Sequence, residues 1–522
     1  MTGQGRDILI GIDAGTSVIK SVAFLLDGTQ IAMASVPNRY TSRADGAAFQ
    51  SQSKTWADCA QTLRDLADKV PGLAARTAAL AVTGQGDGTW LVGKDNQPVT
   101  DGWLWLDARS SATAIRLRQS EPPARFESTG TALNACQMGV QLAHMDTTQP
   151  DMLDAAEVAL HCKDWLYLNL TGVRATDPSE ANFTFGNYLT RTYNDTVVAS
   201  LGLEHRRALL PEIVDGAGQT HGLTAEAARQ TGLREGTPVS LAYVDVVCTG
   251  LGAGLYTPEA ATGCTIVGST GMHMRAAPAD QVKLSAEPSG YIMVLPVPGM
   301  VAQIQTNMAS TLNIDWLLGL GADLITEMGG TVSHANLVAR IEDWLARTPP
   351  GEVIYHPYIS EAGERGPFID TNARAGFAGL GSKHGFADLL RAVIEGLGYA
   401  GRDCYDAMGG VPSQVRLTGG AARSTALRKI LSAALNASVR TASREEAGAA
   451  GAAMTAAVAI GAYADMNDCI ADWVQPLLGP SEAPDPALAA RYDALFPSYR
   501  NMRRDAGPIW ATLAAIKETH HA

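Results

Sequence analysis

The stretch "ILIGIDAGTSVIKSVAFLLDG", residues 8–28, decides the fold of this chain. An apolar run ends at Asp13, passes through the small residues Ala14 and Gly15, and resumes as a second apolar run before the turn at 27–28. Such runs, bounded by small turn residues, predict two adjacent β-strands. Both a plain hairpin and a cradle for phosphate and metal fit this pattern.

The turn itself carries residue types suited to an anion and a metal ion. Because Asp13 ends a strand, its carboxylate is expected to point out of the sheet edge, where it can hold a hydrated Mg²⁺. Gly15 lets the backbone approach an anion closely, and Lys20 can neutralise charge. Thr16 and Ser17 add amide and hydroxyl donors. In the alternative interpretation, Asp13 only hydrogen-bonds to its own turn.

Strands and helices alternate beyond this stretch. Residues 53–70 carry apolar side chains at helical spacing, and residues 76–93 read as an apolar strand, a glycine-rich turn and a second strand. The pattern of apolar strand, small-residue turn and second strand is repeated at 263–277. We infer an internal duplication into two α/β halves, residues 1–247 and 248–522, each opening with strand, small-residue turn and strand.

The last third of the chain is mainly helical. Residues 386–408 predict a helix by periodicity, and residues 414–435 read as strand, Gly-Gly turn and helix. Residues 447–464 lack charge over a length near the minimum for a membrane span. Because they are mostly Ala and Gly, they predict a buried helix packed closely against neighbouring backbone, and no membrane association.

Bulk composition narrows the class of protein. A chain of 522 residues predicts at least two domains. The net charge of −13 and the absence of a basic run argue against nucleic acid as a partner. The seven cysteines are far apart and form no C-x-x-C pair, so they predict neither a disulfide framework nor a zinc knuckle. A reducing cytoplasm fits best, and the polar N-terminus shows no secretory signal.

Three glycine-rich patterns resemble nucleotide motifs but lack an essential part. "GTWLVGKD", residues 88–95, has the Gly and Lys spacing of a P-loop, but Asp95 stands where Ser or Thr should ligate Mg²⁺. It predicts a turn between strands. "GQGDG" at 84–88 and "GLGAG" at 250–254 are each too short for a dinucleotide fingerprint.

Two further small-residue turns follow apolar strands. "VGSTG", residues 267–271, supplies hydroxyls, and "LTGGAARS", residues 417–424, opens a helix whose free N–H groups suit a nucleotide. Together with the first turn, they predict a nucleotide bound between two α/β halves.

Asp245 stands within the apolar run from Pro238 to Val247, which predicts another strand. A carboxylate flanked by Val244 and Val246 either faces solvent on a half-exposed strand or lies in the cleft between the halves. In the cleft it could accept the proton of an attacking hydroxyl, the general-base role in phosphoryl transfer.

Four segments together resemble the FGGY family of carbohydrate kinases, within the actin-like ATPase superfamily. They are "GIDAGTSVIKSVAF", "YVDVVCTGLGAG", "TIVGSTG" and the block at 417–458. Their order and spacing match over nearly the whole chain, and the last block is the most specific. The resemblance implies two ribonuclease-H-like domains hinged around a central ATP cleft, with sugar or polyol held mainly by the first domain.

The resemblance also implies roles for single residues. By position, Asp13 is similar to the Mg²⁺-linked carboxylate, and Asp245 is similar to the catalytic base. Gly15, Thr16, Ser17 and Lys20 resemble the first phosphate-binding loop of the family. The second phosphate-binding loop corresponds to Gly268, Ser269 and Thr270, and the adenosine site to Gly419, Gly420 and Ser424.

Substrate choice depends on positions where this chain departs from its relatives. Glycerol kinases typically show Arg-Glu, and xylulose kinases Met-His, where this chain has Gly86-Asp87. Losing the long Arg is expected to leave room, while Asp87 keeps an acceptor for hydroxyl protons. Trp105 matches an aromatic that packs on the substrate carbon chain, although a core Trp fits equally. Cys136 stands where glycerol kinases carry a tyrosine, which argues against glycerol.

Taken together, the segments at 82–92, 269–275 and 355–370 are most similar to the family members that act on erythritol. The resemblance therefore implies ATP-dependent phosphorylation of a terminal hydroxyl of a short polyol by a cytoplasmic enzyme, which we expect to be a homodimer. Alternatives within the family are kinases for xylulose, ribulose or glycerol. Outside it stand a sugar-sensing regulator and a non-kinase actin-like ATPase. His273 and His356 could be substrate contacts, but a lone histidine beside apolar residues is more often structural, which is the prediction made here.

Overall fold

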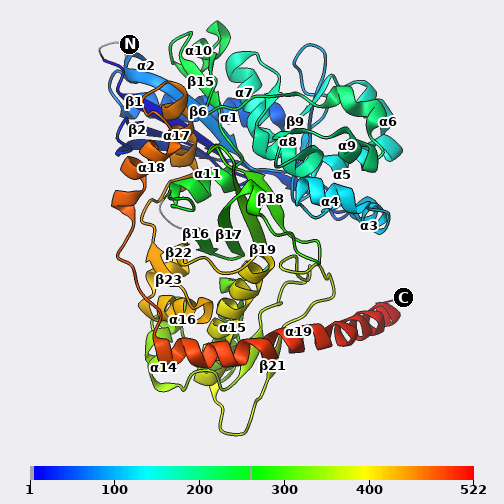
Figure 1. Cartoon of the computed structure of the whole chain (residues 1–522), viewed down its shortest axis with the longest axis vertical. Coiled ribbons are helices and arrows are strands. Elements are labelled where there is room, and N and C mark those ends of the chain that lie inside the picture. The colour runs from blue at the N-terminus through cyan, green and yellow to red at the C-terminus, as the bar shows by residue number, and fades with distance from the viewer. Residues whose placement is uncertain (1–4, 259–260, 522) are drawn as a thin grey trace.

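Two six-stranded mixed sheets organise the chain, one in each half of the molecule (Figure 1). The computed structural model describes residues 5–258 and 261–521. In spatial order, the first sheet contains β14 (His221–Gly222), β15 (Pro238–Leu241), β6 (Thr77–Gly84), β1 (Ile8–Ala14), β2 (Val18–Leu25) and β3 (Gln30–Pro37). The second contains β18 (Tyr291–Val294), β19 (Met300–Asn307), β17 (Gly271–Pro278), β16 (Thr262–Val267), β22 (Gln414–Thr418) and β23 (Ser438–Thr441).

The two sheets repeat one strand pattern. In the first, β1, β2 and β3 run antiparallel, and β6 and β15 extend the sheet in parallel with β1. In the second, β16, β17 and β19 run antiparallel, and β22 and β23 extend it in parallel with β16. The strand, turn and strand predicted at the start of each half are confirmed, and so is their repetition. The division at residue 247, which falls inside a helix, remains a prediction.

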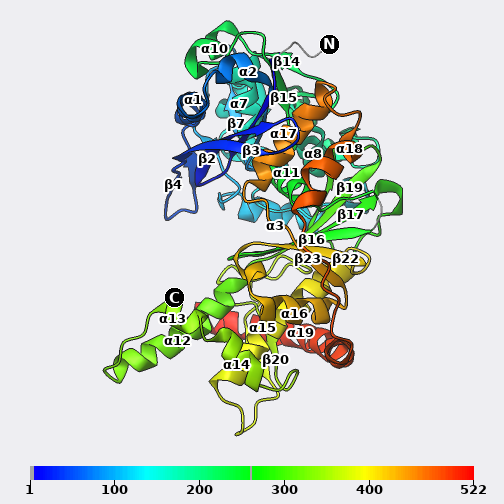
Figure 2. The same ribbon diagram turned by 90° about the vertical axis from the view of Figure 1, so that its left-hand side faces the viewer.

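The helices predicted from periodicity are present. They are α1 (Gln52–Lys69), α15 (Phe386–Ala407), α16 (Thr425–Leu435) and α17 (Ala447–Ala459). Helix α1 begins after Ser51, whose hydroxyl accepts a hydrogen bond from the Lys54 N–H, and it buries Cys59, Leu63 and Leu66 in the core of the first sheet. Two projecting elements complete the second half, α12 (Thr311–Glu327) and the long α19 (Pro486–His521) (Figures 1 and 2).

Helix α17 joins the two halves. Its residues from Ala447 to Ala457 are all buried, and it packs on β1 and β6 of the first sheet and on α11 (Asp245–Gly252). A Cβ built on Gly451 would lie 2.1 Å from the Cys248 carbonyl oxygen, and one on Gly11 would lie 1.9 Å from the Ala449 carbonyl oxygen. Only glycine permits this backbone contact, which confirms the buried, closely packed helix predicted here.

The strand predicted over residues 238–247 is wrong beyond Leu241. Strand β15 pairs with β6 through Leu241, and α11 then begins at Asp245. Residues from Val239 to Val244 are all buried, and periodicity cannot separate a buried strand from a buried helix start. Asp245 is therefore the first residue of a helix.

The predicted strands at 76–93 form, but they belong to different sheets. The second is β7 (Trp90–Val92), which pairs with β9 (Val158–Leu160) and not with β6. The segment with P-loop spacing makes a turn after β7, where the Gly93 N–H donates to the Gln97 carbonyl oxygen.

The remaining strands form small sheets around these layers. They are β4 (Thr41–Ser42), β5 (Ala48–Gln50), β8 (Gly102–Trp103), β10 (Ala175–Thr176), β11 (Gly186–Asn187), β12 (Thr192–Tyr193), β13 (Glu212–Ile213), β20 (Ile354–His356) and β21 (Gly376–Ala378). Shorter helices are α2 (Leu73–Arg76), α3 (Ser111–Gln119), α4 (Pro123–Thr129), α5 (Met138–Thr148), α6 (Pro150–Asp154), α7 (Cys162–Thr171), α8 (Pro178–Phe185), α9 (Asp195–Ser200), α10 (Ala225–Thr231), α13 (His334–Val338), α14 (Ile341–Arg347) and α18 (Met466–Trp473). Across residues 5–258 and 261–521, none of the helices has the length and apolar character that a bilayer crossing requires.

Candidate active site

Asp13 lies where β1 meets the first turn of α17. A Cβ built on Gly448 would lie 2.4 Å from its Oδ2, so the helix backbone reaches the carboxylate. The pKa of Asp13 is raised to about 6, mainly because burial disfavours the charged form; the positive charge of Lys20 opposes this rise, and the negative charge of Glu446 adds to it. Within the described residues, the Asp13 carboxylate makes no hydrogen bond to the turn at 14–17. The interpretation that it only stabilises its own turn is therefore wrong.

Asp245 stands at the N-terminus of α11, next to that contact. Burial raises its pKa to about 8, and the negative charges of Asp13 and Asp87 act in the same direction. The Val246 N–H and Lys163 partly oppose this rise. Three carboxylates, from β1, from the loop after β6 and from α11, thus share one electrostatic environment. Such mutual perturbation is typical of active sites.

The first small-residue turn is held by three side chains. The Thr16 hydroxyl donates to Gln85 Oε1 at 2.9 Å and accepts from Trp105 Nε1 at 2.9 Å, while Gln50 Nε2 donates to the Thr16 carbonyl oxygen. Trp105 is 40% exposed, so the alternative of a core tryptophan is wrong. Lys20 Nζ forms an ion pair with Glu446 Oε2 at 2.8 Å, and Glu446 is the residue that precedes α17.

The second and third turns lie against each other in the second half. Ser269 and Thr270 are exposed between β16 and β17. Gly419 has φ of 93°, and a Cβ there would lie 2.6 Å from the Val267 carbonyl oxygen, so the two turns touch through glycine. Gly420 is exposed beside it.

Two helices begin at these turns. The carbonyl oxygens of Gly268 and Ser269 accept from the N–H groups of Thr311 and Ser310, which open α12. Ser424 caps α16 by accepting from the Leu427 N–H, and its hydroxyl donates to Glu342. Exposed glycine backbone next to helix starts is suited to phosphate and nucleoside.

Asp87 lies in the loop after β6 with φ of 57°. Its Oδ2 accepts hydrogen bonds from the Cys136 thiol at 3.2 Å and from the Tyr291 hydroxyl at 3.3 Å. Burial raises the pKa of Asp87. Sequence reasoning missed Tyr291 because it comes from β18 of the second half.

The expectation that Gly86 leaves room is wrong. A Cβ built on Gly86 would lie 2.5 Å from Val244 Cγ2 and 3.1 Å from Glu180 Oε1. The side chains of two other elements fill the space that a long residue at this position would enter.

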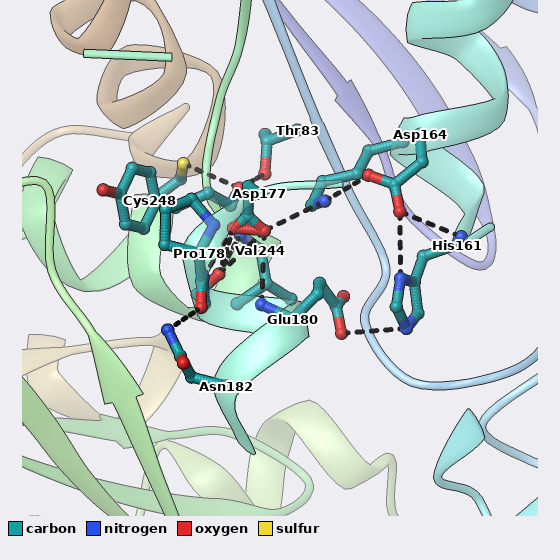
Figure 3. Close-up of polar contacts among 12 residues, drawn as sticks. Thr83, His161, Asp164, Asp177, Pro178, Glu180, Asn182, Val244 and Cys248 are labelled. Atoms are coloured by element: carbon teal, nitrogen blue, oxygen red, sulfur yellow. Dashed lines mark hydrogen bonds and ion pairs between the residues drawn. The ribbon is translucent and has the colours of Figure 1, made fainter. Parts of the chain in front are cut away.

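A buried charged cluster behind Gly86 was also missed, and Figure 3 shows it. His161 Nδ1 donates to Asp164 Oδ2 at 2.9 Å, and Lys163 Nζ pairs with Asp164 at 2.6 Å and with Asp177 at 3.0 Å. Lys163 is the main favourable charge that lowers the pKa of Asp164 to about 2, against burial, which raises it. His161 Nε2 lies 3.4 Å from Glu180 Oε2.

This cluster is hydrogen-bonded to Val244, the residue that precedes Asp245. Asp177 caps α8, and the hydroxyl of Ser179 accepts from the Val244 N–H at 3.1 Å. Glu180 follows Ser179, and burial raises its pKa well above the ordinary value. The segment "TDPSE" does carry the signal of a helix start, with Asp177 as the cap and Pro178 at the first helical position, but nothing in it indicates that these acids are buried.

His273 and His356, the two histidines singled out in the sequence, have the structural role predicted for them. His273 is buried between Thr265 and Asn307, and burial lowers its pKa to about 4. His356 Nε2 donates to the Tyr499 carbonyl oxygen at 2.9 Å.

Comparison with known proteins agrees with this geometry. Residues 8–252 match the N-terminal domain, and residues 263–460 the C-terminal domain, of the FGGY family of carbohydrate kinases. The chain is 61% identical, over 98% of both chains, to a protein of Brucella abortus (strain 2308) named erythritol kinase. It is 27% identical to the xylulose kinase of Escherichia coli (strain K12), over 81% of this chain and 84% of that one.

A solved structure shows the same fold. The xylulose kinase of Rhodospirillum rubrum superposes with a TM-score of 0.86 at 24% identity, over 97% of this chain and 100% of that one. The family matches cover both sheets and all three small-residue turns. The chain belongs to the FGGY family of carbohydrate kinases.

Proposed function

We propose that this protein transfers the γ-phosphoryl group of ATP to a terminal hydroxyl of a short polyol, erythritol. Family membership gives a carbohydrate kinase that uses ATP. The relative named erythritol kinase supports the particular substrate, because identity of 61% extends over 98% of both chains. The observation that carries the catalytic assignment is the position of Asp245, at the start of α11 beside Asp13 and Asp87.

Asp245 acts as general base in this proposal. Its ionised carboxylate accepts the proton of the attacking hydroxyl as the oxygen approaches the γ-phosphorus in line. Asp87 and the exposed ring of Trp105 orient the polyol. The glycine-rich turns, at Gly15–Ser17, Gly268–Thr270 and Gly419–Gly420, bind the nucleotide through backbone N–H groups. Ser424 and Lys20 complete these sets.

The residues around Asp13 fit a divalent cation. The Asp13 carboxylate lies at a point where its charge disfavours ionisation of Asp245, and a cation would relieve that repulsion. Asp13 would hold Mg²⁺, through water. When bound, Mg²⁺ offsets the negative charge of the transferring phosphoryl group.

Closure of the two domains, 1–247 and 248–522, would exclude water and prevent hydrolysis of ATP. We also propose a homodimer in the cytoplasm. The seven cysteines are all buried and free in the described structure, which fits a reducing compartment.

A coupled assay of ATP consumption tests the function. Erythritol, glycerol, xylulose, ribulose and no acceptor are compared with the wild type. Strong turnover with erythritol alone is expected. Faster turnover with xylulose, ribulose or glycerol would show that erythritol is not the substrate, although the protein would still be a kinase. Equal ATP consumption without an acceptor would favour an actin-like ATPase.

A further inference from the structure

Strand β18 connects the second half to the polyol side of the first half. It is an edge strand that pairs with β19, and its other side faces α8 (Figure 1). The Ile292 N–H donates to the Thr131 hydroxyl at 3.1 Å, and the Gly290 carbonyl oxygen accepts from the Ala132 N–H at 3.1 Å. These bonds fix β18 against the first half.

Tyr291 opens this strand and reaches Asp87. Its hydroxyl donates to Asp87 Oδ2 at 3.3 Å and lies 3.7 Å from Cys136 Sγ. The ring packs edge-on against Phe183, with centroids 5.6 Å apart. The phenol is therefore held in place by a ring contact on one side and by a carboxylate on the other.

The two oxygens of Asp87 differ in their surroundings. Oδ2 accepts both the Tyr291 and the Cys136 hydrogen bonds. Oδ1 is buried and has no hydrogen-bond partner in the described part of the chain. An unpaired buried carboxylate oxygen is costly, so it is a natural acceptor for a donor that the substrate brings. A polyol offers a hydroxyl on every carbon, and Asp245 uses only one of them.

We propose, on the basis of the proposed function, that Tyr291 is a positioning residue that sets polyol specificity. With Cys136 it holds Asp87 Oδ2, so that Oδ1 accepts a hydroxyl of the polyol other than the one that is phosphorylated. One end of the polyol site is thus completed by the second half of the molecule. Loss of the Tyr291 hydroxyl frees Asp87 to turn, and the remote hydroxyl then loses its acceptor.

Tyr291→Phe tests this assignment, because it removes the hydroxyl and keeps the ring against Phe183. The acceptors are erythritol and two triols that each lack one of its hydroxyls, 1,2,3-butanetriol and 1,2,4-butanetriol. We expect the variant to raise the KM for erythritol about tenfold or more, since the lost bond is to a charged group. Both kcat and the KM for ATP should stay within about twofold. For one of the triols, wild type and variant should agree, because that triol already lacks the hydroxyl bound by Asp87.

Tyr355→Phe is the matched control, since Tyr355 is a buried tyrosine of the second half whose hydroxyl donates to Asn313. It should leave every acceptor KM unchanged. Cys136 provides a second route if Tyr291→Phe is poorly folded. Cys136→Ala should raise the KM for erythritol, and Cys136→Ser, which keeps a donor to Oδ2, should restore it.

The outcomes separate this assignment from the function itself. An erythritol KM within twofold of wild type in Tyr291→Phe overturns the role of Tyr291 and leaves the kinase standing. An equal loss for erythritol and both triols, or a parallel change in the KM for ATP, also overturns it, because that pattern indicates general damage. A wild type that phosphorylates none of the acceptors overturns both proposals.

Discussion

Burial and neighbouring charge decide what each carboxylate of this site can do. Asp13, Asp87 and Asp245 all have raised pKa values, and in each the largest cause is removal from water. A base whose pKa lies near the working pH combines a useful fraction of ionised form with a strong affinity for the proton. Asp245, with a pKa of about 8, meets that condition better than an exposed aspartate would.

Asp245→Asn is expected to lower kcat by about 10²- to 10⁴-fold, the usual contribution of a general base. The amide cannot accept the hydroxyl proton, whereas the small-residue turns that we propose bind ATP are unchanged. Steady-state kinetics and calorimetric titration with ATP measure the two effects. Asp403→Asn is a matched control, because Asp403 is a buried carboxylate on α15 that contacts Arg500 and Arg503. A kcat near the wild-type value in Asp245→Asn would contradict the assignment.

The pH dependence of kcat/KM follows from the same residue. Only ionised Asp245 can accept a proton, and its ionised fraction in the free enzyme increases as pH rises through its pKa of about 8. We therefore expect kcat/KM for the polyol to increase from pH 6 to pH 9. Initial rates at low polyol concentration, with saturating ATP, measure this profile. A profile that is flat or declines over this range would argue that another group is the base.

Site residues could be predicted from the sequence where they stand in a short motif, and not where their place depends on contacts between distant segments. Asp13, Thr16 and Asp245 stand in short motifs, and in the structure the charge of Asp13 acts on Asp245 while the Thr16 hydroxyl donates to Gln85 in the loop after β6. Tyr291 and Glu180 have no such motif, because their positions depend on contacts between segments far apart in the chain. The space at Gly86 was misjudged for the same reason.

At the scale of elements, glycine determines how closely the central helices approach. Helices α11 and α17 meet at Gly252 and Gly451, where a Cβ would lie 2.2 Å and 2.1 Å from carbonyl oxygens of the other helix. A contact of this kind tolerates no side chain at all.

Gly451→Ala is expected to destabilise the protein by roughly 1–3 kcal/mol or more, the usual cost of overpacking. Gly319→Ala is the control, since Gly319 lies in α12 with no heavy atom within 4 Å of its built Cβ. Alanine there should be neutral or stabilise by up to about 1 kcal/mol through helix propensity. Chemical denaturation of both variants measures the difference, and equal midpoints would refute the packing argument.

Helices and strands with a strong hydrophobic periodicity could be predicted from the sequence. Those that lie in continuously buried stretches, where no periodicity marks their ends, could not. The periodic α1 and α15 and the strands on both sides of each turn follow from local pattern. The start of α11 does not, because the residues from Val239 to Val244 are mostly apolar and buried throughout. The pairing of β7 with β9 likewise depends on segments about 70 residues apart, which single-sequence patterns do not encode.

At the scale of the whole molecule, one apolar core continues through both halves. Side chains of the first sheet, such as Leu9 and Phe24, belong to the same buried cluster as Met274 and Ile304 of the second. Buried acids also lie in both halves, so their titration acts on the stability of the whole chain.

Glu364 offers a way to measure how the titration of one buried acid changes the stability of the chain. It is buried, and burial raises its pKa from the ordinary 4.5 to about 7. A raised folded-state pKa gives stability that is complete below pH 4.5 and is lost as pH rises through 7, by about 3 kcal/mol in all. Glu364→Gln, which cannot ionise, should flatten the decline in the denaturation midpoint between pH 5 and pH 8. The exposed Glu361→Gln should keep the wild-type slope, and a Glu364→Gln slope equal to wild type would refute this account.

The backbone contact between α11 and α17 makes the two helices one rigid unit, because interlocked glycine backbone leaves no room for one helix to slide along the other. Asp13 touches the start of α17, and Asp245 is the first residue of α11, so this unit fixes the spacing of the two carboxylates. The turns at Ser269 and Gly419 belong to the second sheet and lie outside this unit. We therefore expect any movement of these turns to leave the distance between the two carboxylates almost unchanged.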